Sequence, residues 1–268
     1  MIFLQIFHVL GTILTKMSEK LSIFAHENKD MTTMECKIIA HIETDFDSKF
    51  GVPRQAGLIP ELEGRIVFEP DYRVSEALRG LEGYSHLWLI WVFSEVLAEQ
   101  SSKKPTSWSP TVRPPRLGGN RRMGVFATRS PYRPNPIGLS CVEMAGIEFY
   151  TTDGPVIYVK GADLMNGTPI LDIKPYLPFA DSHPDARGGF TEQTKEQKPL
   201  EVVIPEELYT LYNLKKDQWT ALSKVLSQDP RPHYQHDEKR IYGISFAGID
   251  FHFKITDDGV VYLLEPTA

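Results

Sequence analysis

The order of apolar and polar residues along the chain predicts many short strands in its first two thirds. Short apolar or alternating runs that end at Gly, Pro or polar residues are typical of β-strands. Such runs occupy residues 35–43, 64–69, 84–93, 122–128, 137–147, 156–159 and 170–173. A short helix capped by Ser75 is expected through Leu78. Because strands are many and helices few, residues 35–180 are predicted to form a β-barrel or a β-sandwich.

The pattern changes after residue 180. A polar stretch with Gly188-Gly189 indicates a linker, and Pro205 begins a predicted helix with Glu206 and Glu207 at its positive end. The apolar residues of this helix fall on one face: Leu208, Leu211, Tyr212, Trp219, Leu222 and Leu226. Three strands follow at 240–246, 250–255 and 260–264, the last two joined by a hairpin turn at Asp258-Gly259. We therefore divide the chain into residues 1–33, 34–182, 183–199 and 200–268: an extension, a β domain, a linker and a small α+β domain.

Composition adds that this is an ordinary globular chain. Of its 268 residues 41% are apolar and 24% are charged, and a chain of this length can bury a sizeable core. The two cysteines, Cys36 and Cys141, form no C-x-x-C pair, so neither a disulfide framework nor a thiolate zinc site is indicated, and a reducing cytoplasm is the expected location.

The first fifteen residues are apolar but lack the charged start and the cleavage site of a signal peptide. They are also shorter than the ~20 residues that cross a bilayer as a helix. We interpret residues 1–33 as a dispensable extension, with a membrane anchor as the alternative, and expect no membrane association.

The charge distribution is uneven. A formal charge of −6 argues against nucleic-acid binding, yet residues 100–142 contain no Asp or Glu and hold eight of the 29 lysines and arginines. The local field, rather than the net charge, determines where a phosphate backbone binds. Within this region prolines and glycines build a stiff frame for the arginines of residues 111–138, and guanidinium groups suit phosphates and bases. The alternative is a loop of solvated arginines.

No common nucleotide-binding or hydrolase motif is present: G-x-G-x-x-G, the P-loop, H-E-x-x-H and G-x-S-x-G are all missing. Instead, VRPPRLGGNRRMGVFATRSPYRPNPIG at 112–138 closely resembles the signature of the TrmO family, also called YaeB or TsaA-like. FGVPRQAGL, LEGYSHLWLIWVF, NGTPILDIKPYLPFADS and DPRPHYQ follow the family in the same order, at 50–58, 81–93, 166–182 and 229–235. The resemblance covers residues 37–265.

The resemblance implies a tRNA methyltransferase that uses S-adenosylmethionine. Family members methylate N6 of threonylcarbamoyladenosine at position 37, next to the anticodon of threonine tRNA. They have a small β-barrel rather than a Rossmann sheet, and they act as homodimers with the cofactor near the subunit interface. The expected fold is thus mainly β, a small non-Rossmann barrel with a small C-terminal α+β domain.

Cofactor-binding roles are carried over from the family to ten residues: Gln55, Ala56, Gly57, Phe93, Ser94, Arg129, Leu139, Asp163, Leu164 and Asn166. One departure concerns Asn166, because the family commonly has D-G-T-P where this chain has N-G-T-P. If that carboxylate faced the sulfonium, cofactor binding would be weaker here, unless Asp163 or Asp172 replaced it.

The chemistry requires an aligned displacement at the sulfonium methyl group without water. Aromatic walls suit a cation, and the candidates are Phe93, Trp91, Tyr132 and Tyr176. The predicted catalytic residues are Asp172, Lys174 and Tyr176; Asp172 and Lys174 lie on one side of an extended segment, so a structural ion pair is the alternative.

The predicted RNA contacts are Arg113, Arg116, Arg121, Arg122 and Arg133, with Arg231 on a phosphate and Tyr234 on a base. For the last two the alternative is a hinge between helix and strand. No metal is expected, because His233 and His236 lack a third ligand. The competing functions are a non-catalytic RNA-binding module, motivated by Asn166, and a hydrolase, which would need a metal cluster or an activated nucleophile.

Overall fold

The computed structural model describes residues 34–101, 108–117, 121–194, 198–231, 237 and 239–265. The chain divides into two compact units, Met1–Lys37 and Ile38–Ala268. Of the first unit only residues 34–37 are described, and they form no helix or strand. The predicted extension at 1–33 lies outside the described residues. Among the helices described, none is long and apolar enough to cross a membrane.

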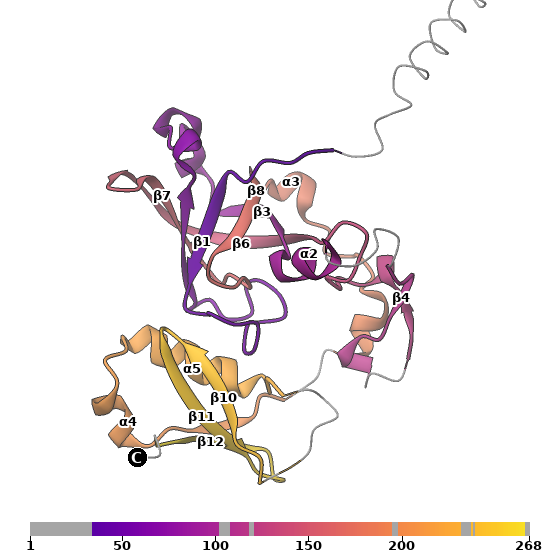
Figure 1. The fold of residues 1–268 in the computed structure, drawn as a ribbon, viewed down its shortest axis with the longest axis vertical. Helices are drawn as coiled ribbons and strands as arrows, with labels where there is room; N and C mark the ends of the chain where they lie inside the picture. Colours follow the sequence, from indigo (N-terminus) through magenta and orange to yellow (C-terminus); the bar gives the residue numbers. More distant parts are fainter. Residues whose placement is uncertain are drawn as a thin grey trace, which may run out of the picture. The chain divides into compact units, whose positions relative to one another are not determined.

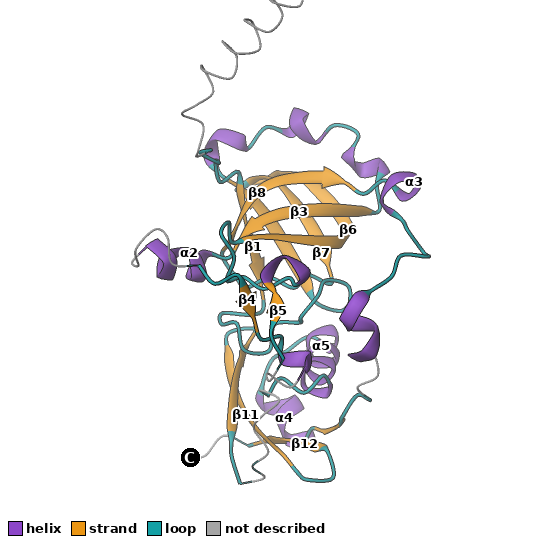
Figure 2. Cartoon of the chain, turned by 90° about the vertical axis from the view of Figure 1, so that its right-hand side faces the viewer, coloured by secondary structure: helices purple, strands orange, loops and turns teal. Residues whose placement is uncertain are grey.

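A closed six-stranded barrel forms the centre of the second unit (Figures 1 and 2). Its strands are β1 (Ala40–Thr44), β2 (Glu63–Phe68), β3 (His86–Val92), β6 (Ile137–Thr151), β7 (Gly154–Lys160) and β8 (Thr168–Pro175). The order around the barrel is β1-β2-β7-β6-β3-β8, and every neighbouring pair is antiparallel. Closure leaves no free edge, so the backbone groups of all six strands have partners within the barrel.

The barrel interior follows from the alternation of side chains along each strand. On β3, Leu87, Leu89 and Trp91 are buried, whereas the residues between them are half-buried or exposed. The buried positions of the other strands complete one core: Ala40, Ile42, Ile66, Phe68, Val142, Ile157, Val159 and Ile170.

Short helices and one small ribbon connect the strands. Between β2 and β3 lie three 3-10 helices, Pro70–Tyr72, Ser75–Leu78 and Leu81–Gly83, and α2 (Ser94–Ser101) follows β3. The basic, proline-rich segment forms β4 (Thr111–Val112), a 3-10 helix at Pro115–Leu117, β5 (Met123–Gly124) and a 3-10 helix at Val125–Ala127. After β8 come α3 (Pro178–Asp181) and a 3-10 helix at Gly189–Thr194.

The C-terminal part is a four-stranded sheet with two helices. Its elements are β9 (Glu201–Val203), α4 (Glu206–Leu211), α5 (Lys216–Ser227), β10 (Tyr242–Phe246), β11 (Ile249–Ile255) and β12 (Val260–Leu264). The sheet order is β10-β11-β12-β9, with β9 parallel to β12. Helix α5 buries one face against this sheet, through Trp219, Ala221, Leu222, Val225 and Leu226.

Loops at one end of the barrel belong to the C-terminal core. Phe46, Ile59 and Leu62 are buried in the same cluster as the residues of α5 and of β10 to β12. Phe46 packs edge-on against Phe246 at 5.4 Å between ring centroids, and the Ala247 N–H donates to the Asp45 carbonyl at 2.8 Å. The two parts therefore share apolar surface and backbone hydrogen bonds.

The predicted fold class, mainly β with a small barrel and a C-terminal α+β unit, is confirmed. The domain boundaries placed at 34–182, 183–199 and 200–268 stay a prediction. Within the expected linker, the residues at 189–194 form a short helix rather than an extended connection.

Five local predictions need correction. The first strand begins at Ala40 rather than at residue 35. Ser75 is the first residue of its helix, and its hydroxyl donates to the Phe149 carbonyl instead of capping. The segment 122–128 forms a strand only at Met123–Gly124: the Val125 N–H still donates to the Pro110 carbonyl opposite it, but Pro110 has no N–H to return a bond, and the chain turns into a 3-10 helix.

The helix expected after Pro205 is interrupted. It ends at Leu211, and α5 begins afresh at Lys216, where Gln218 Oε1 accepts the Lys215 N–H at 3.0 Å. The last hairpin has a three-residue loop, since Thr256 N–H bonds to the Val260 carbonyl and Gly259 has a φ of +82°. A positive φ at the third loop residue is the geometry of a bulged hairpin rather than of a two-residue turn.

Candidate functional site

Five of the predicted cofactor-binding positions meet in the structure, where the loop after β1 approaches the turn before β8. Arg129 Nη1 donates to Gln55 Oε1, and the backbone N–H of Ala56 bonds to the Asp163 carboxylate. The Gly57 N–H donates to the Gly161 carbonyl at 2.8 Å. A guanidinium, an amide and a carboxylate from three distant segments are thus brought together; residues 55–57, Arg129 and Asp163 are called the Asp163 cluster below.

Asp163 is the acid of this cluster. Burial raises the pKa of its carboxyl group above the usual value. Hydrogen bonds from Ser140 and from the backbone, with the positive charge of Arg129, act in the opposite direction but do not cancel the effect of burial. A half-buried carboxylate with a raised pKa beside a guanidinium is a candidate for a functional site, because binding and catalytic groups often need a shifted pKa.

A hydrogen-bond relay connects Asp163 to the barrel interior. Trp91 Nε1 donates to Ser140 Oγ at 2.9 Å, and Ser140 Oγ donates to Asp163 Oδ1 at 2.5 Å. The Trp91 ring lies directly over Gly138, where a Cβ atom would approach the indole to 2.2 Å. Gly138 is therefore required by the position of Trp91, and Trp91 orients the serine that fixes the carboxylate.

The backbone of the loop that carries Gln55 is held at both ends. At its far end, a Cβ on Gly161 would lie 3.1 Å from the Gly57 Cα, so two glycines allow the close approach. At its near end, Phe50 stacks on Phe253 at 6.3 Å, and Gly51 has a φ of +92° against Ile244. The C-terminal sheet thus fixes the start of the loop that carries Gln55.

Phe93 and Ser94 lie at the end of β3 that carries Trp91. Phe93 is half-buried, its ring centroid is 4.3 Å from that of Trp91, and its N–H donates to the Pro136 carbonyl. Ser94 is the first residue of α2. Trp91 itself is 7% exposed and points into the barrel, so it supports the site from behind instead of forming an open aromatic wall.

Leu164, another predicted cofactor-binding position, places its side chain in the barrel core. Its side chain is 1% exposed in the barrel core, and its carbonyl accepts the Thr44 hydroxyl at 3.0 Å. The side chain of Leu164 therefore packs in the barrel core.

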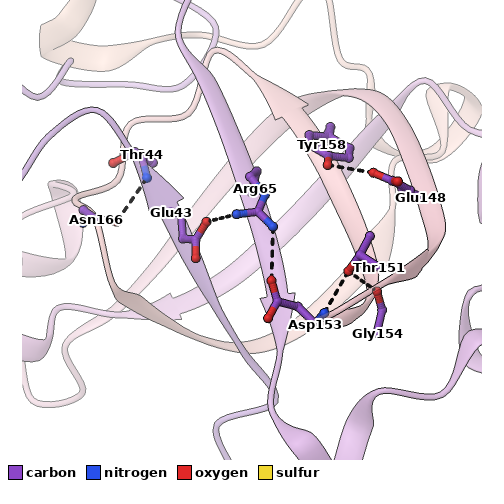
Figure 3. A network of polar contacts seen from close by, with 9 residues as sticks. All are labelled: Glu43, Thr44, Arg65, Glu148, Thr151, Asp153, Gly154, Tyr158 and Asn166. Atoms are coloured by element: carbon purple, nitrogen blue, oxygen red, sulfur yellow. Dashed lines mark hydrogen bonds and ion pairs between the residues drawn. The ribbon is translucent and has the colours of Figure 1, made fainter. Parts of the chain in front are cut away.

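The side chain of Asn166 is hydrogen-bonded to the loop after β1. Its Oδ1 accepts the Thr44 N–H at 3.3 Å, as Figure 3 shows, and its Nδ2 donates to Asp47 Oδ1 at 3.1 Å. Because an aspartate could not donate to Asp47, the amide has a structural reason in this chain. The replacement of the family's Asp by Asn is thus explained without reference to a cofactor.

The predicted catalytic residues lie on the outer surface of the barrel. Lys174 Nζ and Asp172 Oδ2 form an ion pair at 2.8 Å, with 62% and 46% of the side chains exposed. Tyr176 packs beside Trp88 at 5.9 Å between ring centroids. The ion pair that the sequence suggested is therefore present. In a single chain both of its side chains are open to solvent.

This outer surface is apolar beside the ion pair. Asp172 is opposite Ile90 on β3, and Ile90 is opposite Leu139 on β6, which is 52% exposed. Ile137, two residues earlier, is 43% exposed. We call the outward side of β3, β6 and β8 the apolar face. The opposite side, over β1, β2 and β7, is covered by polar contacts centred on Arg65 and Tyr158 (Figure 3).

At one border of the apolar face, Asp181 fixes Trp88. Its Oδ2 accepts the Leu177 N–H at 2.8 Å and the Trp88 Nε1–H at 3.0 Å. These two hydrogen bonds lower the pKa of the Asp181 carboxyl group. The carboxylate thereby holds a tryptophan ring on the outer surface in a defined orientation.

The predicted RNA-binding arginines are mostly exposed. Arg113 and Arg121 are exposed, and Arg122 is exposed with its Nη1 donating to Thr111 Oγ1 at 3.0 Å. Arg133 is half-buried and its Nη1 donates to the Thr128 carbonyl at 3.4 Å. The side chain of Arg116 lies outside the described residues.

Arg231 departs from its predicted role. Its side chain is 10% exposed, and its guanidinium holds both oxygens of Asp229 at 2.9 and 3.0 Å. Asp229 has a φ of +50°, so the fork stabilises a turn in the left-handed region. In this structure Arg231 orders the turn after α5 and does not present its charge to a phosphate. Its neighbour in the motif, Tyr234, lies outside the described residues.

The structure adds two features that the sequence reasoning missed. Ser140 is polar at an inward position of β6, between Gly138 and Val142, and this break in the alternation is a signal for a buried hydrogen bond. Trp108 and Phe126 form an exposed ring pair beside the arginines.

Two hollows lie elsewhere on the second unit. One, of about 280 Å³, borders residues 49–54 and residues 225 and 228–230, next to the loop that leads to Gln55. The other lies along α5 beside Tyr209 and Lys216. Neither is lined by a predicted cofactor residue. Among the described residues, no group of three or more His, Cys, Asp or Glu is arranged to hold a metal ion.

Comparison with known proteins places the whole architecture. The model of the tRNA-methyltransferase O N-terminal domain matches residues 41–182, and the model of the TrmO C-terminal domain matches residues 197–265. The Escherichia coli protein named tRNA (adenine(37)-N6)-methyltransferase is 38% identical over 242 residues, which are 88% of this chain and 100% of that protein.

A curated protein and a solved structure from Pseudomonas aeruginosa extend the comparison. One, provisionally named an S-adenosylmethionine-dependent methyltransferase, is 37% identical over 85% of this chain and 95% of its own length. The crystal structure of TrmO from this organism superposes with a TM-score of 0.69 and 30% identity, covering 89% of this chain and 100% of that chain. Because both family models and full-length relatives match, the chain belongs to the tRNA-methyltransferase O (TrmO) family.

Proposed function

We propose that the protein transfers a methyl group from S-adenosylmethionine to N6 of adenine 37 in tRNA. The single observation that carries the proposal is the match over nearly the whole chain to a relative named for this reaction, together with the Asp163 cluster at the matching loops. The finer substrate is threonylcarbamoyladenosine in threonine tRNA, which the resemblance implies.

The residues of the Asp163 cluster fit the cofactor by their chemistry. S-adenosylmethionine carries an ammonium group, a carboxylate, a sulfonium and an adenine ring. Asp163 is an acceptor for the cationic groups, Arg129 is a partner for the carboxylate, and the Gln55 amide is both donor and acceptor. Leu139 and Phe93 provide apolar surface for the adenine and for the methyl group.

The cofactor, when bound, supplies an activated methyl group on a positively charged sulfur. The protein's own part is then to align acceptor and donor and to exclude water. The relay from Trp91 through Ser140 keeps Asp163 in one orientation, so little ordering remains to be done on binding. Asp172 is our candidate to accept the proton, with Lys174 beside it at 2.8 Å.

A homodimer would complete this site. Leu139, Asp172, Lys174 and Tyr176 lie on or beside the apolar face, where they are open in a single chain. Covering this face with a second copy would remove water from the ion pair and bury Ile137 and Leu139. We therefore propose a dimer through the apolar face, and a cytoplasmic location, where tRNA is processed.

The alternative of a non-catalytic RNA-binding module loses its motivation. It depended on Asn166 in place of Asp, and the amide of Asn166 is used to join Thr44 and Asp47. The carboxylate chemistry stays with Asp163.

The direct test uses S-adenosylmethionine labelled on its methyl group and total tRNA from cells that lack this activity. The purified protein is expected to transfer label to tRNA, and Asp163→Asn to lose most of this transfer while binding tRNA as before. Failure of the wild-type protein to label tRNA at saturating cofactor would reject the proposed function.

A further inference from the structure

The ribbon formed by β4 and β5 carries two exposed aromatic rings that neither the barrel core nor the Asp163 cluster uses. Trp108 is 44% exposed and Phe126 is 71% exposed. Their ring centroids are 5.9 Å apart, with an angle of 43° between the planes. The ribbon is a two-stranded sheet separate from the barrel (Figure 2). Two adjacent large apolar side chains that are exposed to solvent indicate a binding surface.

Backbone hydrogen bonds join the two strands next to both rings. Thr111 is paired with Gly124, and the Val125 N–H donates to the Pro110 carbonyl at 2.9 Å. Trp108 and Phe126 therefore extend from the two strands at the same end of the ribbon. Val125, beside Phe126, is 1% exposed and anchors this end. The two rings thus lie next to each other beside a paired segment of backbone.

The other end of the same ribbon is positively charged. Arg113, Arg121 and Arg122 are exposed on the same ribbon, and Arg122 is oriented by Thr111. Residues 100–142 contain no Asp or Glu. An aromatic surface and exposed guanidinium groups on one ribbon match a single-stranded nucleic acid, whose bases stack on the rings while its phosphates pair with the arginines. A protein-binding patch is typically a wider apolar area with few charges at its centre.

We propose that Trp108 and Phe126 form a stacking platform for an unpaired base of the RNA substrate, in the loop that contains the methylated adenine. The arginines of the ribbon bind the phosphates on either side of this base. The platform recognises an open loop by its exposed base faces and is tolerant of sequence, because every base has a π-face. The inference rests on the proposed function for the identity of the substrate.

The test measures binding of a 17-nucleotide anticodon stem-loop with one loop base replaced by fluorescent 2-aminopurine. Phe126→Ala and Trp108→Ala are expected to weaken binding about tenfold to a hundredfold each, and to abolish the fluorescence quenching that stacking causes. Phe126→Tyr should keep both. Tyr150→Ala, at the β6–β7 turn where Tyr150 is 92% exposed, is the matched control and should bind like wild type.

Three further readouts separate base stacking from a general loss of binding or of folding. A fully paired RNA duplex should bind all variants equally, since it offers no open base. S-adenosylmethionine binding, measured by calorimetry, should be unchanged in both alanine variants. If the wild-type protein binds the stem-loop but never methylates it, the proposed function is rejected, while the binding and quenching measurements still test the stacking platform.

Two results would overturn the platform. One is unchanged stem-loop affinity and quenching in both alanine variants. The other is a shift of the variants from dimer to monomer in sedimentation with RNA affinity intact, which would assign the rings to a contact between copies of this chain. Because both side chains are exposed, thermal unfolding of the variants is expected to match wild type.

Discussion

Gly51 provides the sharpest test of how the C-terminal sheet supports the loop that carries Gln55. Its φ of +92° lies where a side chain is strained, and an added Cβ would lie 2.4 Å from Ile244 Cδ1 and 3.1 Å from Ile244 Cγ1. For Gly51→Ala the left-handed backbone costs about 1–2 kcal/mol, and overpacking against Ile244 costs about 1–3 kcal/mol. We therefore expect a loss of about 2–5 kcal/mol in the free energy of unfolding.

The second variant isolates the contact. Ile244→Val removes Cδ1 alone and should cost about 0.5–1.5 kcal/mol by itself. In the double variant the closest clash is absent, so its loss should be smaller than the sum of the single losses by about 1 kcal/mol or more. Urea denaturation of the four proteins measures this coupling.

The same cycle connects packing to function. Gly51 is four residues before Gln55, so Gly51→Ala should weaken S-adenosylmethionine binding, and Ile244→Val should restore part of the affinity in the double variant. Additive unfolding energies, within about 0.5 kcal/mol, would refute the contact. Intact cofactor affinity in a destabilised Gly51→Ala protein would refute the link to the loop.

Three further outcomes follow from the structure. Because burial raises the pKa of Asp163, the folded state binds this proton more tightly than the unfolded state does, so ionisation of Asp163 lowers stability above the raised pKa. Asp163→Asn should therefore unfold at a higher temperature than wild type at pH 7, with an advantage that shrinks as pH falls through the raised pKa and vanishes below the ordinary one, while cofactor affinity falls about tenfold or more. Asp153→Asn, on the polar side of the barrel, is its control, and a less stable Asp163→Asn with normal affinity would mark a structural acid. Arg129→Ala should reduce methyl transfer much more than stability, because its guanidinium is exposed and contacts Gln55. Equal losses of methyl-transfer activity and of thermal stability would contradict this. Removal of residues 1–33 should leave transfer to tRNA unchanged, and a large drop would give the extension a role.

The fold was accessible from the sequence where alternation is strong. The run from His86 to Val92 is bounded by turns and alternates cleanly, so both its strand and its buried side could be predicted. The segment 122–128 could not, because Pro110, opposite Val125 on the partner strand, has no N–H to continue the pairing, and the chain turns into a 3-10 helix. The break between α4 and α5 likewise depends on Gln218, whose bond to the Lys215 backbone outweighs an apolar pattern that runs through both helices.

The site was predictable in its residue types more than in its arrangement. Motif resemblance selected Gln55, Arg129 and Asp163 from three separate segments, and the structure brings them together. It also selected Leu164 and Arg231, which are a core residue and a turn residue, because a motif does not distinguish the side chain that binds from the side chain that shapes the backbone. Ser140 was missed because its role depends on Trp91, a neighbour across the sheet rather than along the chain.

The measurement that tests the proposed methyl transfer most directly is mass spectrometry of nucleosides from threonine tRNA after incubation with the protein and S-adenosylmethionine. We predict one added methyl group on N6 of threonylcarbamoyladenosine at position 37, formed by wild type and nearly absent with Asp163→Asn. A methyl group on another nucleoside, or unchanged tRNA at saturating cofactor, would contradict this assignment.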